Sequence, residues 1–215
     1  MGGRGSSFGT EVISARSIKG ESGEVKSLNV AGMTPTEQGS RYTNTNKTLA
    51  FIEKQKLEHK EEQLQVIDRH GYVTRAFQGD EHSVAVDLET RTYMKGKVVT
   101  HNHPSVYGGT FSDADINCLK MGMKELRASA KEGTYSMKAT KMANSEAFYD
   151  AYCKDAGKMQ REMNKISIES AKKKWRSYDD YQYANRKEQL AVIDGWYRKN
   201  AEKYGYKYDF EPRKE

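Results

Sequence analysis

The chain has 215 residues, of which 36% are hydrophobic and 31% charged, and its formal net charge is +6. This length suffices for one domain with a sizeable core, but the low apolar share predicts that part of the chain is flexible or lies in exposed helices. No apolar run approaches the roughly 18 residues of a membrane span, and the first residues lack the apolar core of a signal peptide. The two cysteines form no CxxC pair. These features exclude a disulfide framework and a membrane partner, and they favour a cytoplasmic protein.

The first half of the chain predicts an arm, a helix and a hairpin. Residues 1–44 are rich in Gly, Ser, Thr and Asn, which predicts a flexible N-terminal arm with one short strand at 11–15. Residues 46–62 have helical spacing with a thin apolar face. The spacing then changes to period two, and two strands joined by the turn "DRHG" predict a hairpin over 62–78. Residues 82–87 fit a strand or a helix equally well.

The second half predicts two further strands and several helices. Residues 96–103 predict a strand that ends in two histidines, and residues 134–140 predict another. Between them, 112–133 predicts one amphipathic helix that begins at an N-cap serine and ends at a glycine. Residues 144–203 predict one or two long helices with a break around "RSYDDYQ". The predicted mixture of strands and helices indicates the fold class α/β (α+β).

Residues 143–215 are predicted to be a basic, Tyr-rich helical extension. Aromatic residues alternate there with lysines and arginines, a pattern typical of nucleic-acid or protein binding. Aromatic residues on a helix more often pack against their own domain, so both interpretations stay open. Strong, salt-sensitive DNA binding by this segment would favour the first. The aromatic residues concerned are Trp175, Tyr178, Tyr181, Tyr183, Trp196 and Tyr197.

The stretch "THNHPSVYGGTFSDAD" (100–115) predicts a metal site. His101 and His103 are two residues apart on a strand, so their imidazoles project to the same face and can bind one metal ion, for which Zn²⁺ is the usual occupant. A catalytic zinc ion needs about three protein ligands and an open position. Asp115 is the candidate third ligand, because the Gly-containing loop can return the first helical turn to the strand end.

Two further residues would complete a hydrolytic site. The Ser112 hydroxyl can donate a hydrogen bond to an oxyanion that forms on a substrate carbonyl. A general base is also needed, and Glu62, which is in phase with the strand residues after it, is the candidate. Glu61 is the alternative, because a one-residue change of register would exchange the faces of the two side chains.

The pattern His101-Asn102-His103-Pro104 followed by Ser112-Asp113-Ala114-Asp115 resembles the JAB/MPN (JAMM) metalloprotease family. "HNHPS" and the upstream "EEQLQVIDRHGYV" resemble its RadC-type bacterial branch. The resemblance covers about residues 60–140, and the loop between His103 and Ser112 holds eight residues where seven is usual. It implies a mixed sheet flanked by helices, with Zn²⁺ held by the histidines and aspartate and with the glutamate as base.

The resemblance implies zinc-dependent hydrolysis of peptide or isopeptide bonds, with a protein or peptide substrate such as a ubiquitin-like conjugate. It also implies a JAB/MPN-like domain at 45–142, between the arm 1–44 and the extension 143–215. The alternative is a catalytically inactive JAB-like binding or phage structural module whose basic helices bind nucleic acid or protein. The start "MGGRGSSFG" and the mosaic layout are similar to bacteriophage and mobile-element proteins, which implies the cytoplasm of a bacterium or of a phage-infected host cell.

Overall fold

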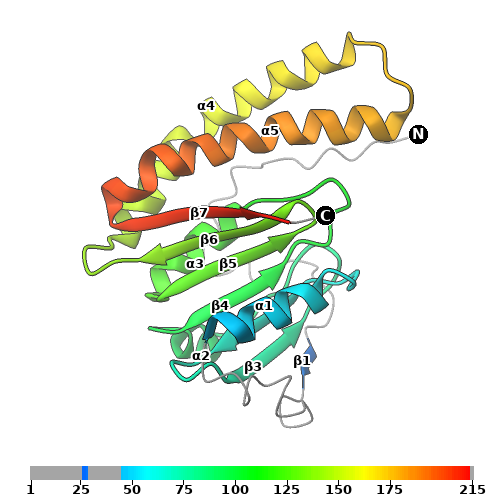
Figure 1. The fold of residues 1–215 in the computed structure, drawn as a ribbon. Coiled ribbons are helices and arrows are strands. Elements are labelled where there is room, and N and C mark those ends of the chain that lie inside the picture. Colours follow the sequence, from blue (N-terminus) through cyan, green and yellow to red (C-terminus); the bar gives the residue numbers. More distant parts are fainter. Residues whose placement is uncertain (1–25, 29–44, 214–215) are drawn as a thin grey trace.

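The computed structural model describes residues 26–28 and 45–213, so the strand predicted at 11–15 and most of the predicted arm lie outside the described residues. The described strands form one mixed sheet in the order β1-β3-β2-β4-β5-β6-β7 (Figure 1). Only β4 and β5 are parallel; every other neighbouring pair is antiparallel. The strands are β1 Lys26–Leu28, β2 Gln63–Ile67, β3 Val73–Gln78, β4 Val98–Asn102, β5 Glu125–Ala130, β6 Gly133–Ala139 and β7 Tyr206–Pro212.

Helices cover both faces of this sheet, as predicted for a mixed α/β fold. One core cluster joins α1 to β2, β3 and β4, and a larger cluster on the other face joins the sheet to α3, α4 and α5 (Figure 1). None of the helices in the described part of the chain combines the length and apolarity that a bilayer crossing needs. The helices are α1 Thr45–Lys56, α2 Leu88–Tyr93, α3 Asp113–Cys118, α4 Ser145–Ala171 and α5 Tyr178–Asn200, with 3₁₀ turns η3 Leu119–Met121 and η4 Ala201–Tyr204.

The predicted hairpin over 62–78 is confirmed as β2 and β3, and the predicted strands at 96–103 and 134–140 are confirmed as β4 and β6. Residues 82–87 form neither a strand nor a helix. They lead into α2, whose first turn is capped by the side chain of Asp87. The predicted arm contains at least one ordered piece, because β1 pairs with β3.

The single helix predicted over 112–133 is wrong. Helix α3 ends at Cys118, and after η3 the chain turns at Gly122, whose φ of 71° lies in the left-handed region that favours glycine. It then enters β5, which lies between β4 and β6. Met123 and Leu126 continue the helical spacing of α3, but Leu126, Ala128 and Ala130 also alternate with period two. Pairing on both sides decides between these patterns in favour of the strand.

The C-terminal segment is confirmed as two long helices, and both pack into the main core. Phe148 and Tyr152 of α4 and Trp196 and Tyr197 of α5 are buried there. The predictions do not include β7, which pairs with β6 along its whole length. The described part of the predicted extension, residues 143–213, therefore shares its core and its sheet with the preceding strands.

A network of buried charges fastens α1 to the sheet. Arg127 on β5 forms a two-pronged ion pair with Glu53 of α1, with N–O distances of 2.6 and 3.0 Å, and contacts Glu125 at 2.9 Å. Lys56 donates a hydrogen bond to the carbonyl of Thr100 on β4 at 2.8 Å. Burial lowers the pKa of Lys56 to about 7. Both side chains of the Glu53–Arg127 pair are largely buried, so water replaces little of the interaction if one partner is removed.

Arg127→Leu should lower the free energy of unfolding by about 3–5 kcal/mol, because it leaves the buried carboxylate of Glu53 without its cation. Urea denaturation measures this loss. The control is Lys165→Leu, which breaks the exposed Lys165–Glu162 pair on α4 and should cost roughly 0.2–1 kcal/mol. Equal, small losses in the two variants would contradict a structural role for the network.

Candidate metal centre

The register between β2 and β4 sets which side chains meet at the candidate centre. Leu64 lies opposite His101 in the antiparallel pair, and Val66 lies opposite Val99. These four side chains share one face of the sheet, the face of the larger core. Glu62, two residues before Leu64, projects to the same face and is 7% exposed.

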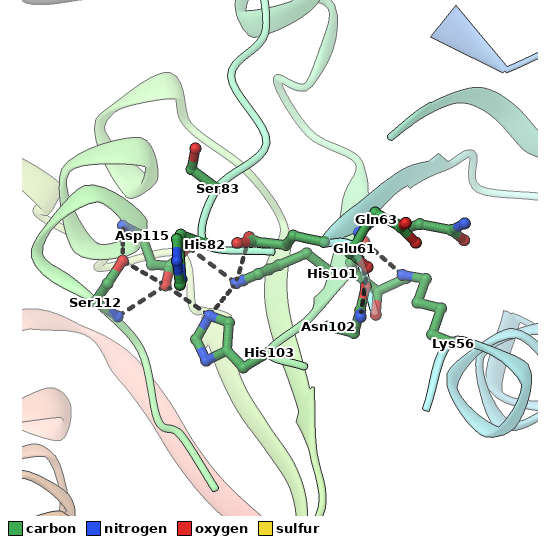
Figure 2. Close-up of polar contacts among 12 residues, drawn as sticks. Lys56, Glu61, Gln63, His82, Ser83, His101, Asn102, His103, Ser112 and Asp115 are labelled. Atoms are coloured by element: carbon green, nitrogen blue, oxygen red, sulfur yellow. Dashed lines mark hydrogen bonds and ion pairs between the residues drawn. The ribbon is translucent and has the colours of Figure 1, made fainter. Parts of the chain in front are cut away.

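Two histidines and one aspartate converge at the end of β4 (Figure 2). The Nε2 atoms of His101 and His103 are 2.9 Å apart. The carboxylate of Asp115 lies 3.0 Å from His101 Nε2 and 3.5 Å from His103 Nε2. Glu62 Oε1 lies 4.0 Å from His101 Nε2, and one ligand atom from each of Glu62, His101 and His103 lies within 4.8 Å of the others. The structure therefore brings together the residues predicted as ligands and as base.

Of the two candidate bases, Glu62 is the one whose carboxylate lies at the centre. Glu61 contributes its backbone carbonyl, which accepts a hydrogen bond from Asn102 Nδ2 at 3.1 Å. The amide of Gln63 donates to Asn102 Oδ1 at 2.6 Å. The single side chain of Asn102, 1% exposed, thus holds the backbone on both sides of Glu62 (Figure 2).

Ser112 and Asp115 form a reciprocal capping box at the start of α3. The amide of Asp115 donates to Ser112 Oγ at 3.2 Å, and the amide and hydroxyl of Ser112 donate to Asp115 Oδ2 at 2.7 and 2.8 Å. The cap fixes the carboxylate with its other oxygen toward His101. It also means that the hydroxyl proton of Ser112, the predicted oxyanion donor, is engaged by Asp115 in this structure.

The spacing of these atoms fits a small divalent ion. Four ligands at about 2.0 Å from a tetrahedral zinc ion are about 3.3 Å apart. The two histidine Nε2 atoms are 2.9 Å apart, and the two oxygens of Asp115 lie 3.0 Å (Oδ1) from His101 and 3.5 Å (Oδ2) from His103. Glu62 Oε1 lies farther from His101 Nε2, at 4.0 Å, and its carboxylate lines the cleft. Two imidazoles and a carboxylate suit zinc but also iron, nickel or cobalt, so the donor set alone does not select the metal.

The pKa values of Glu62 and Asp115 are shifted in opposite directions, by burial in the first case and by the neighbouring histidines in the second. Burial raises the pKa of Glu62 to about 7, and the nearby histidines only partly oppose this. Burial also acts to raise the pKa of Asp115, but His101 and His103 outweigh it and hold that pKa well below its usual value. For His103, burial acts to lower the pKa, but the hydrogen bond and charge of Asp115 raise it. One carboxyl is thus kept ionised between the imidazoles, while the other can exchange a proton near neutral pH.

A cleft of about 750 Å³ opens at this centre. Its lining includes Glu62, His103 and Ser112 of the centre and also Asn185 and Arg186 of α5. Helix α5, from the predicted extension, is therefore a wall of the cleft. Of the aromatic residues predicted as a binding surface, Trp196 and Tyr197 are core residues, whereas Tyr178 and Tyr183 are exposed.

The loop from His103 to Ser112 is held by residues that the sequence did not reveal. Tyr197 of α5 donates a hydrogen bond to the carbonyl of Phe111 at 3.1 Å. Tyr152 of α4 donates to Asp113 Oδ1 at 2.5 Å. Tyr197 lies 86 positions after its partner Phe111, and no sequence pattern links either tyrosine to the histidines. Asn102 did carry a signal, because strand alternation places it opposite its two histidine neighbours.

Comparison of the chain with protein-family models, with curated proteins and with solved structures finds no match. The geometry and chemistry of the centre are therefore the basis for a functional proposal.

Glu62→Gln should stabilise the metal-free protein in a pH-dependent way. A carboxyl whose folded pKa is raised from 4.5 to about 7 contributes its stability below about pH 4.5 and loses it as the pH rises through 7. The variant should therefore exceed the wild type by at most about 3 kcal/mol at pH 8, with a difference that shrinks toward pH 5. Urea denaturation in the presence of a chelator measures both values.

The matched control for this comparison is Glu81→Gln, an exposed glutamate on the same cleft. The difference in unfolding free energy between Glu81→Gln and the wild type should be the same at pH 5 and at pH 8. If Glu62→Gln behaves in the same way, the carboxyl of Glu62 is not the group that burial perturbs.

Proposed function

We propose that this protein is a zinc-dependent metallopeptidase that hydrolyses peptide or isopeptide bonds. The observation that carries the proposal is the convergence of His101, His103 and Asp115 within 3.5 Å at the end of a buried strand, with Glu62 beside them on an open cleft. The resemblance of "HNHPS" and the downstream serine and aspartate to the JAB/MPN pattern supports the choice of zinc and of this reaction.

In the proposed site, His101, His103 and Asp115 hold the ion. A bound zinc ion supplies Lewis acidity, which polarises a substrate carbonyl and lowers the pKa of a nearby water molecule. Glu62 accepts a proton from that water molecule while the water oxygen adds to the carbonyl carbon of the substrate. Glu62 then delivers the proton to the nitrogen as the C–N bond breaks, so that an amine and a carboxylic acid leave. A carboxyl with a pKa of about 7 suits both transfers near neutral pH.

Ser112 would serve the reaction in two ways. Its backbone and side chain hold Asp115 in the orientation needed for a ligand. Its hydroxyl lines the cleft and would donate to the developing oxyanion once ion binding draws electron density from the Asp115 carboxylate and weakens the existing hydrogen bond. Binding of nucleic acid by the basic helices stays a prediction, for which the exposed Tyr178 and Tyr183 and the half-buried Trp175 and Tyr181 are the remaining aromatic candidates.

Metal content by elemental mass spectrometry tests the proposed centre. Purified wild-type protein should contain about one zinc ion per chain, and Asp115→Ala should lose most of it because one of three ligands is removed. The control is Asp150→Ala, since Asp150 is an exposed aspartate of α4 that is not among the residues lining the cleft. No zinc in the wild type after incubation with the ion would refute the proposal.

Hydrolysis of a peptide and isopeptide library tests the reaction. Glu62→Gln should retain zinc and lose at least about 100-fold in kcat, since the general base is removed. Wild-type activity should fall as the pH decreases below about 7, because Glu62 must be ionised to accept a proton. A bound cation stabilises the ionised carboxylate and therefore moves this fall in activity to lower pH. Full activity in Glu62→Gln would show that another group is the base.

A further inference from the structure

The side chain of Glu132, in the turn between β5 and β6, contacts the loop that follows the histidines. Its Oε1 atom accepts a hydrogen bond from the backbone amide of Gly109 at 3.0 Å. The same oxygen accepts from the hydroxyl of Tyr135 at 2.8 Å. Its second oxygen, Oε2, is buried and has no hydrogen-bond partner among the described residues. A carboxylate buried on one side must be fixed by its neighbours, and here these are the loop backbone and Tyr135.

The loop passes through a narrow space between Glu132 and His103. Gly108 has a φ of 85°, and a Cβ atom there would lie 2.3 Å from Glu132 Oε2. A Cβ atom on Gly109 would lie 3.0 Å from Nδ1 of His103. The two glycines are therefore needed where the backbone is enclosed by a carboxylate on one side and an imidazole on the other.

Gly109 connects these two side chains. His103 uses Nε2 toward His101 and Asp115, and it makes a hydrogen bond to the backbone of Gly109. The facing atom is Nδ1, since that is the ring nitrogen beside Gly109. A metal-binding histidine is oriented by the partner of its second nitrogen, and loss of such a partner typically costs 10–100-fold in metal affinity.

Glu132 is itself fixed by the C-terminal part of the fold. The ring of Tyr135 on β6 stacks on Phe210 of β7, with ring centroids 4.6 Å apart. Arg186 of α5 interacts electrostatically with Glu132 and compensates part of its charge. A contact path thus runs from β7 through Tyr135 and Glu132 to the loop.

We propose that Glu132 is a positioning residue for His103: by holding the amide of Gly109 it fixes the Gly109 backbone, which hydrogen-bonds to the imidazole and orients it toward the proposed metal position. The inference rests on the proposed metal centre but not on peptidase activity. The side chain acts as a hydrogen-bond acceptor in this role, so an isosteric amide, whose carbonyl oxygen can accept from the same amide, preserves it.

The experiment measures zinc affinity of the full chain by competition with a chromophoric chelator, and the visible spectrum of the Co²⁺-substituted protein. Glu132→Leu should bind zinc 10–100-fold more weakly than wild type, with altered cobalt bands because the ligand geometry changes. Glu132→Gln should stay within about threefold of wild type. The control, Glu81→Leu, removes another glutamate of the same cleft, whose ion pair is with His82, and should leave zinc affinity unchanged.

Tyr135→Phe keeps the ring packing while removing one hydrogen bond to Glu132, so it tests the same path if Glu132→Leu does not fold. It should weaken zinc binding by a smaller factor, about two- to fivefold, with unchanged circular dichroism. Wild-type zinc affinity and an unchanged cobalt spectrum in both Glu132→Leu and Tyr135→Phe would overturn the inference. Equal losses in Glu132→Leu and Glu81→Leu would also overturn it, because cleft charge would then explain the effect.

These outcomes separate this inference from the proposed function. Weakened zinc binding in Glu132→Leu, together with a wild-type protein that binds zinc but cleaves no peptide, would sustain the role of Glu132 and overturn the peptidase proposal. A wild-type protein that binds no zinc would overturn both.

Discussion

The antiparallel register of β2 against β4 is the constraint on which the candidate centre depends. A shift by one residue would replace Glu62 with Glu61 beside His101, and it would move Leu64 and Val66 out of the main core. Two forces oppose the shift. The apolar residues lose their burial if it occurs, and the amide of Asn102 loses both of its backbone partners. Packing and chemistry therefore require the same register, and the strand that carries the histidines also fixes the position of the glutamate.

The other half of the centre depends on the return of the loop after His103. Asp115 reaches the histidines only because the loop folds back, and the contacts that hold it come from distant parts of the chain: Tyr197 on the carbonyl of Phe111, Tyr152 on Asp113 and Glu132 on Gly109. The C-terminal helices thus hold the loop that carries the candidate ligand Asp115 and also form a wall of the cleft.

The sequence predicted the features that depend on local residue patterns, but it did not predict those that depend on strand pairing between distant segments. The histidine spacing, the cap at Ser112 and the hairpin with Glu62 are local signals, and the structure brings these residues together. The stretch after Cys118 satisfied helical and strand periodicity at once, and only its place between β4 and β6 decides the outcome. Because 112–133 was interpreted as one helix, Glu132 fell at its end, and its contact with Gly109 could not be foreseen. β7 does carry a signal, since Tyr206, Tyr208 and Phe210 alternate with charged residues.

The aromatic stack of Phe210 on Tyr135 has a consequence for the order in which the molecule is made. The ribosome synthesises a chain from its N-terminus, so His101, His103 and Glu62 emerge well before α5 and β7. Until those late segments dock, Glu132 lacks its fixed neighbour and the loop lacks the tether from Tyr197. In a nascent chain the side chains of the candidate centre would lack their final orientation, and the centre would reach its final geometry only after β7 has paired with β6.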